Sequence, residues 1–289
     1  MLVQQLVNGF TLGMMYALLA LGYSLIFGVL SFINFAHGDV AVFSAYSFWW
    51  LYTIKSIPFL PAILLALLIG ALLGIVIERL GYKPIRKAPR LSAVIVSMGF
   101  SFILSVLIQI IWGTNPHQVS SVGKIKTWNF GSFLINSLQL WILGLAIIIM
   151  ILLQLLLKKT RIGLAMRAIA LDRNTSMLMG VNVDTTVSVV FAVGSITGAI
   201  SAIMMAIYYG ALYTVMGANI GMKGFAAVVL GGAGSMPGAV IGGLLLGLIE
   251  SLAGTFLNTQ LRDAISAVIV ILMLVIKPAG LLGKDVIKE

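Results

Sequence analysis

The chain has no cysteine and few charged side chains. Only 9% of its 289 residues are Asp, Glu, Lys or Arg, whereas soluble domains carry roughly a quarter. Without cysteine there is no disulfide, thiolate metal site or thiol nucleophile. Because 61% of the residues are hydrophobic and the mean hydropathy is +1.13, the composition excludes a water-soluble enzyme.

Long apolar runs recur along the whole chain, and runs of about 20 such residues cross a bilayer as helices. They predict an all-α polytopic membrane protein with eight to nine transmembrane helices. The expected spans are 9–30, 38–54, 58–77, 91–112, 137–157, 185–209, 237–256 and 261–277, with a short ninth crossing at 219–231. Because the first charge is Asp39, the start of the chain is expected to belong to the first span rather than to a signal peptide.

The basic residues lie between the expected spans. Thirteen of the eighteen fall in three stretches: Arg79, Lys83, Arg86, Lys87 and Arg90; Lys158, Lys159, Arg161, Arg167 and Arg173; and Lys277, Lys284 and Lys288. Basic loops remain on the cytoplasmic side of a membrane, so this distribution indicates a lipid bilayer rather than nucleic acid as the partner. It predicts an external N-terminus and a cytoplasmic C-terminus. The remaining basic residues are then expected outside: Lys55, Lys124, Lys126, Lys223 and Arg262.

With this topology the chain forms one transmembrane domain, 1–289, that contains an inverted repeat. The first repeat covers about 9–112, the span 137–157 connects, 158–184 is a cytoplasmic loop, and 185–277 is the second repeat. Each repeat contains a broken or short helix, at 33–39 and at 213–221. Transporters commonly have this plan, with the substrate path near the midplane at the repeat interface.

The first break contains the polar residues Asn34, His37 and Asp39, and the second contains Gly217, Asn219 and Gly221. Polar groups at membrane depth usually face protein, a cavity or one another, so these six residues are candidates for lining or supporting a substrate path. The alternative is an interfacial turn in which Asn34 and Asp39 cap helices. A metal site is not expected, because His37 and Asp39 are too few ligands.

A glycine-rich segment, GGAGSMPG, occupies 231–238. It is not a phosphate-binding loop, because it lacks the lysine and hydroxyl of a Walker A motif. The sequence therefore predicts no nucleotide site and no bound cofactor. The segment favours a tight turn over a moving hinge, through Gly231, Gly232, Gly234, Pro237 and Gly238.

The loop 158–184 is too polar to cross a membrane and rich in helix-forming residues. Asp172 or Asn174 can cap a short helix over Thr175–Met179, and Gly180 can end it. The pattern fits a docking element or an amphipathic helix on anionic lipid. Elsewhere, Glu250 is interpreted as a residue near the outer end of its helix rather than a proton relay, because no second membrane carboxylate with a basic partner is evident at similar depth.

Four segments resemble the LivH-type permease subunit of bacterial branched-chain amino acid ABC importers. In chain order they are FGVLSFINFAHGD (27–39), IERLGYKPIRKAPRLSAVIVSMG (77–99), RAIALDRNTSMLMGVNVD (167–184) and KGFAAVVLGGAGSMPGAVIGGLLLGLIES (223–251). The similarity extends from about residue 5 to residue 280. It implies a multi-pass permease of the bacterial inner membrane that imports leucine, isoleucine or valine by alternating access.

The resemblance also implies partners: a LivM-like permease, two cytoplasmic ATPases that bind ATP and magnesium, and an extracytoplasmic binding protein. In this family the loop at 167–184 couples to the ATPase, which assigns that role to Arg167, Ala168, Asp172, Arg173 and Gly180. A glutamate that the family pattern has near its start is absent, and Arg167 occupies that region. Related permeases for urea, short amides or sugars, and an ion-coupled carrier that acts alone, remain alternatives.

Overall fold

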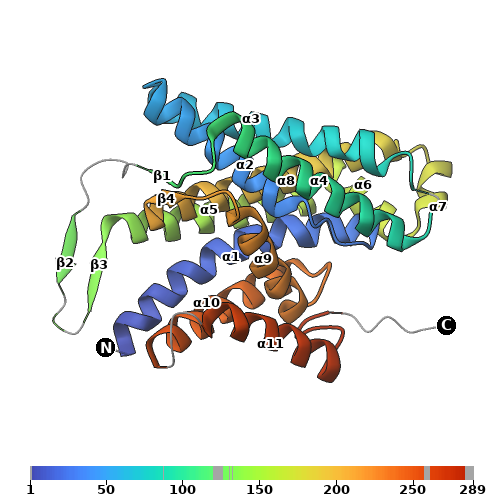
Figure 1. Ribbon diagram of the computed structural model, residues 1–289. Coiled ribbons are helices and arrows are strands. Elements are labelled where there is room, and N and C mark those ends of the chain that lie inside the picture. The colour runs from blue at the N-terminus through green and yellow to red at the C-terminus, as the bar shows by residue number, and fades with distance from the viewer. Residues whose placement is uncertain are drawn as a thin grey trace.

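The computed structural model describes residues 2–86, 88–119, 126–129, 131, 133–256 and 261–283, and these are almost entirely helical (Figure 1). The long helices are α1 (Leu2–Leu30), α3 (Phe59–Ile77), α4 (Arg90–Trp112), α5 (Ser137–Lys159), α8 (Val183–Tyr209) and α10 (Met236–Phe256). The short ones are α2 (His37–Trp49), α6 (Arg161–Leu171), α7 (Arg173–Leu178), α9 (Met216–Gly231) and α11 (Leu261–Ile276). Within the described residues, six helices are long and apolar enough to span a bilayer. The prediction of an all-α polytopic membrane protein is confirmed.

Two features were not predicted from the sequence. The helices α2 and α3 continue into π-helical turns, η1 (Trp50–Ile54) and η2 (Glu78–Tyr82). Two short antiparallel sheets pair β1 (His117–Gln118) with β4 (Ala211–Leu212), and β2 (Thr127–Asn129) with β3 (Leu134–Asn136). The β2–β3 hairpin lies beyond the bundle, at the same end as the N-terminus (Figure 1); we call this the hairpin end.

The helix α1 forms the centre of the bundle. Every residue from Leu12 to Ile26 is buried, because α8 and α10 pack along it, while α3 and α4 lie on the side of the bundle opposite α10 and α11 (Figure 1). Glycines spaced by four allow α1 and α10 to approach closely. A Cβ on Gly247 would lie only 2.2 Å from the backbone nitrogen of Gly13, so the glycine spacing serves helix packing.

The basic stretches gather at the other end of the bundle, with α6 and α7 (Figure 1); we call this the α7 end. The connection after α3 reaches the start of α8 through an ion pair between Lys83 and Asp184. The C-terminal stretch returns beside α9, where the backbone nitrogen of Leu282 donates to the carbonyl of Gly231. This clustering fits a single side of the membrane. Lys87, Lys124, Lys284 and Lys288 lie outside the described residues.

Local sequence explains how α5 joins the two ends. At the hairpin end, Asn136 and Gln139 form a reciprocal capping box, in which the side chain of each accepts the backbone N–H of the other. At the α7 end, Lys158 and Lys159 occupy the last turn, where positive charge is favourable to the helix dipole. Thr160 then caps α6 by accepting the N–H of Gly163 at 3.0 Å, so α6 follows α5 directly.

Candidate functional site

The two breaks expected from the sequence are followed by short helices that meet inside the bundle. The first runs from Ser31 to Ala36, where Asn34 Oδ1 accepts the backbone N–H of Ala36 at 3.1 Å and the hydroxyl of Tyr82 at 2.9 Å. The second runs from Gly210, which has a left-handed φ of +69°, to Val215. The short helices α2 and α9 begin after these breaks, and their first turns touch.

We call the contact between the first turns of α2 and α9 the α2–α9 junction. A Cβ on Gly38 would lie 2.4 Å from the carbonyl oxygen of Gly217 and 2.7 Å from Cα of Gly221. Both neighbours are backbone atoms, which cannot move away cheaply. The junction therefore requires glycine at position 38, and it packs that glycine against Gly217 and Gly221, two of the residues selected from the sequence.

Asp39 lies in the first turn of α2 and against the first turn of α9. Its side chain is buried and accepts a hydrogen bond from Ser101 of α4, and a Cβ on Gly217 would lie 2.2 Å from its Oδ1. Helix N-termini carry partial positive charge, so the Asp39 side chain is positioned to stabilise the N-termini of both α2 and α9. The structure thus places Asp39 and Gly217 together, as a packed element rather than as the wall of a cavity.

His37 is fully buried at the start of α2. Its ring makes an edge contact with Tyr23, with 4.5 Å between centroids. Glycines on both neighbouring helices make room for it, because a Cβ on Gly22 of α1 would lie 2.6 Å from Nε2 and one on Gly198 of α8 would lie 2.9 Å from it. His37 therefore positions α2 between α1 and α8. The remaining selected residue, Asn219, is exposed on α9.

A mostly apolar cavity of about 660 Å³ opens between α1, α5, α6 and α10. Leu21 and Leu25 of α1 line it together with Met150 of α5 and Met166 of α6. Ser24 lines it as well, and its buried hydroxyl has no hydrogen-bond partner among the described residues. The cavity lies near the α7 end, because Arg167 and the glycine turn border it. No local sequence pattern indicates this cavity, because its walls come from four separate helices.

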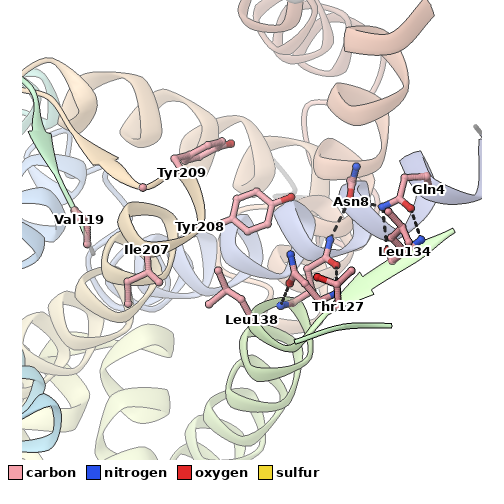
Figure 2. Close-up of a pocket in the computed structure, with 12 residues that line it drawn as sticks. Gln4, Asn8, Val119, Thr127, Leu134, Leu138, Ile207, Tyr208 and Tyr209 are labelled. Carbon is pink, nitrogen blue, oxygen red and sulfur yellow. Dashed lines mark hydrogen bonds between the residues drawn. The ribbon is translucent and has the colours of Figure 1, made fainter. Parts of the chain in front are cut away.

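A second, more polar cavity of about 610 Å³ lies at the hairpin end (Figure 2). Gln4 and Asn8 of α1 line it opposite Tyr208 of α8. Gln4 is held by Leu134 of β3, whose backbone N–H donates to Oε1 at 2.7 Å. The hairpin thus holds the start of α1 by hydrogen bonds, beside this polar cavity.

The glycine-rich segment connects α9 to α10. The connection is short: α9 ends at Gly231, and Gly232 and Gly234 have left-handed φ values of +110° and +80°. Pro237 follows in the first turn of α10, and a Cβ on Gly231 would lie 1.9 Å from the carbonyl oxygen of Gly238. The chain is tightly packed throughout this turn.

The loop at 158–184 folds into α6 and α7, close to the expected short helix. Asp172 caps α7 by accepting the backbone N–H of Asn174 at 2.8 Å, and it also accepts the hydroxyl of Thr175. The hydrogen bonds from Thr175 and Asn174 lower the pKa of the Asp172 carboxyl, so the cap functions as a carboxylate and is lost only as the pH falls through that lowered value. Gly180, with φ of +82°, ends the segment.

The other residues assigned to coupling surround this cap. Arg167 donates to the backbone carbonyl of Leu157 at the end of α5. The carbonyl of Ala168 accepts the N–H of Asp172 at 3.1 Å, and Arg173 begins α7. Together they fix the direction in which α7 leaves α6.

The most exposed apolar side chains of this segment were not recognised in the sequence. Leu171, Leu178 and Met179 are 90%, 87% and 80% exposed. Leu171 ends α6, immediately before the Asp172 cap, and Leu178 and Met179 lie at the end of α7. Such a group of exposed apolar side chains marks a site of protein–protein or membrane interaction.

Glu250 has a basic partner in the structure, Lys223, that sequence reasoning did not anticipate. Glu250 is buried, and its carboxylate is 3.1 Å from the ammonium of Lys223. It also accepts the hydroxyls of Tyr16 at 2.7 Å and Ser266 at 2.6 Å. Sequence reasoning missed this pair because its members lie on different helices, 27 residues apart.

The Lys223–Glu250 pair is expected to stabilise the packing of α9 on α10. Lys223→Met should lower the free energy of unfolding by about 3 kcal/mol, because it leaves a buried carboxylate without its counter-charge. The double variant Lys223→Met/Glu250→Leu should recover part of that loss. Thermal unfolding of the purified variants in detergent measures both effects. A double variant less stable than the sum of the two single ones would contradict this account.

Six described helices long and apolar enough to cross a bilayer, and two short helices whose first turns meet inside the bundle, are typical of a membrane transport subunit. The chain belongs to the family described as the permease component of the branched-chain amino acid transport system, whose model matches residues 5–276. It is therefore a transport subunit, and not an enzyme.

Curated relatives agree over the whole chain. The high-affinity branched-chain amino acid permease LivH of Salmonella typhimurium is 34% identical, over 99% of this chain and 97% of that protein. BraD of Pseudomonas aeruginosa, which has the same description, is 32% identical with the same coverage. A more distant relative, the autoinducer 2 import permease LsrD of Escherichia coli, is 25% identical over 81% of this chain and 72% of its own length. The family thus includes other cargoes.

A solved structure has a similar fold. PsaBC from Streptococcus pneumoniae, in complex with a Fab, covers 94% of this chain and 91% of its own, with a TM-score of 0.52 and 14% sequence identity. At that identity the likeness concerns the fold alone.

Proposed function

We propose that this chain is the membrane-spanning permease subunit of an ATP-driven importer of leucine, isoleucine and valine. The observation that carries the coupling to ATPases is the exposed apolar group of Leu171, Leu178 and Met179 on the segment that Asp172 caps. A chain with no Walker A motif needs a partner that binds ATP and magnesium, and this group offers that partner a contact. The basic stretches around it support a cytoplasmic position, because basic loops remain on that side of a membrane.

The cargo follows from the relatives and from the apolar cavity. LivH and BraD are named for branched-chain amino acids, and a cavity lined by leucine and methionine suits an aliphatic side chain. A transport path must release its substrate, so a mainly apolar lining with few polar partners is suitable for weak binding. We assign this cavity as part of the path, and the α2–α9 junction, with Asn34, His37 and Asp39, as the support that positions it.

The importer requires further subunits. A second, LivM-like permease completes the path, two ATPases bind the α7 end, and a binding protein delivers the amino acid to the hairpin end. The N-terminus is then external and the C-terminus cytoplasmic, in the inner membrane. Because the two repeats have opposite orientation, they move as two bodies around the junction and open the path alternately to each side. The ATPases bind ATP better in one state, and this difference shifts the population.

Uptake of radiolabelled amino acids tests the cargo. Deletion of the gene should remove most of the high-affinity uptake of leucine, isoleucine and valine, and the unaltered gene on a plasmid should restore it. Uptake of urea, short amides and sugars should not change. Unchanged leucine uptake with a loss of urea or sugar uptake would contradict the proposed cargo and would leave the permease assignment intact.

A further inference from the structure

An ion-pair network joins the connection after α3 to the start of α8. Arg86 donates hydrogen bonds to Glu78 and to Asp184, and Lys83 Nζ lies 2.6 Å from the other oxygen of Asp184. Ser188, on α8, donates to Glu78 at 2.7 Å. Glu78 is fully buried and the side chain of Arg86 is 8% exposed, so the inner pair is shielded from water.

On one side, this network reaches the coupling segment. Asp184 lies in the first turn of α8, just after the short connection from α7. The backbone N–H of Val181 donates to the carbonyl of Ser176 at 3.0 Å, and Asn182 caps α8 by accepting the N–H of Thr185 at 3.0 Å. These bonds hold α7 and the start of α8 as one unit, so a displacement of α7 also displaces Asp184.

On the other side, the network reaches the α1–α2 break. Glu78 begins the π-helical turn η2 and Tyr82 ends it; π-helical turns occur frequently at functional sites. The buried Tyr82 donates its hydroxyl to Asn34 in the break at 2.9 Å, and its ring stacks on Phe32 at 4.6 Å. Asn34 in turn accepts the N–H of Ala36, immediately before α2. The α2–α9 junction begins two residues further along.

We propose that Arg86 is a positioning residue that transmits the displacement of α7 to the α1–α2 break and so to the α2–α9 junction. The inference rests on the proposed function, because the partner ATPases move α7. If α8 moved away from η2, Arg86 would lose Asp184 and the buried Glu78 would lose the hydroxyl of Ser188, and a buried carboxylate that loses a hydrogen bond is unfavourable. The two segments therefore move together, and the ion pair converts motion at the α7 end into motion at the junction.

The absence of cysteine makes a direct test possible. A single reporter, Met222→Cys, lies on the exposed face of α9, and its rate of reaction with a small membrane-permeant maleimide reports how far water reaches it. The complete importer, purified with its partner subunits, is labelled without nucleotide and after trapping with ATP and vanadate. In the reporter protein with no other change, trapping should alter the labelling rate. Arg86→Gln should lose most of that difference, and Arg86→Lys should retain part of it.

Two further variants separate transmission from folding. Arg79→Gln removes a positive charge from the π-helical turn η2, but the Arg79 side chain is exposed. The nucleotide-dependent difference in labelling rate of this variant should therefore equal that of the reporter protein. Asp184→Asn breaks only the half-exposed part of the network and should reduce the difference even if Arg86→Gln fails to assemble. A merely structural role would instead change the rate equally with and without nucleotide.

The results overturn the proposal in two ways. In the first, Arg86→Gln and Asp184→Asn both keep the complete nucleotide-dependent difference in labelling rate. In the second, the reporter protein shows no such difference at α9 although its complex hydrolyses ATP. Failure of the proposed function is a separate result. A complex that hydrolyses ATP but does not import leucine contradicts the cargo, and a preparation with no ATPase contradicts the coupling itself.

Discussion

The double variant Leu178→Asp/Met179→Asp should abolish ATP-driven uptake while the chain still inserts and folds. Both side chains are more than three-quarters exposed, so the helix bundle does not depend on them. If they anchor the ATPase, their loss costs about 2 kcal/mol or more of binding free energy, because buried apolar anchors dominate interfaces. That corresponds to binding weakened by about thirtyfold or more, and two aspartates in an apolar contact add the cost of charge desolvation.

Co-purification of ATPase subunits and ATP hydrolysis by the eluate measure this effect. The matched control is Leu178→Met/Met179→Leu, which keeps the apolar character and should bind normally. If α7 instead lies on anionic lipid, the aspartate variant would retain its ATPase subunits and its hydrolysis. Retained ATPase in that variant, at a normal level of the chain in the membrane, contradicts the docking role.

The second large effect is expected at the α2–α9 junction. Gly38→Ala places a Cβ 2.4 Å from a backbone oxygen of α9, so the two helices must separate. Overpacking of this kind costs about 1–3 kcal/mol, and the displaced α2 carries Asp39 away from the first turn of α9. We expect leucine uptake to fall to the level of the deletion strain, while ATPase subunits still co-purify, because α7 is at the far end of the network.

Gly99→Ala is the matched control for this change. It is the same substitution, in the middle of α4, where an added Cβ meets no atom within 4 Å. Since alanine is favoured over glycine inside a helix by about 0.5–1 kcal/mol, this variant should be as stable or more stable, with normal uptake. Normal uptake by Gly38→Ala would show that the junction tolerates separation and takes no part in transport.

The sequence predicted the positions of the long helices well because each is a continuous apolar run, whose physical meaning does not depend on its neighbours. It also predicted α7 closely, since the Asp172 cap and the glycine at 180 act over a few residues of chain. The two breaks were predicted for the same reason. The inverted repeat and the membrane orientation remain predictions that rest on charge and parity.

The features that the sequence did not predict all depend on contacts between distant parts of the chain. The Lys223–Glu250 pair, the Arg86 network and the apolar cavity each bring together different helices, and no local pattern encodes such a meeting. Asn34, His37 and Asp39 were recognised as unusual at membrane depth. Their partners became evident only in the structure: Tyr82 for Asn34, the glycines Gly22 and Gly198 for His37, and Ser101 for Asp39. These contacts show that the three side chains are packed inside the protein, whereas the sequence also allowed them to line a substrate path.

The central claim is that this chain is one subunit of an ATP-driven importer. The most direct test is mild-detergent purification of the tagged chain from its native membrane, with mass spectrometric quantification of co-purifying proteins and an assay of ATP hydrolysis. The account predicts a second permease and two ATPase subunits for each copy, with hydrolysis by the purified complex. A lone chain without ATPase activity, obtained from membranes that still import leucine through it, would contradict the account.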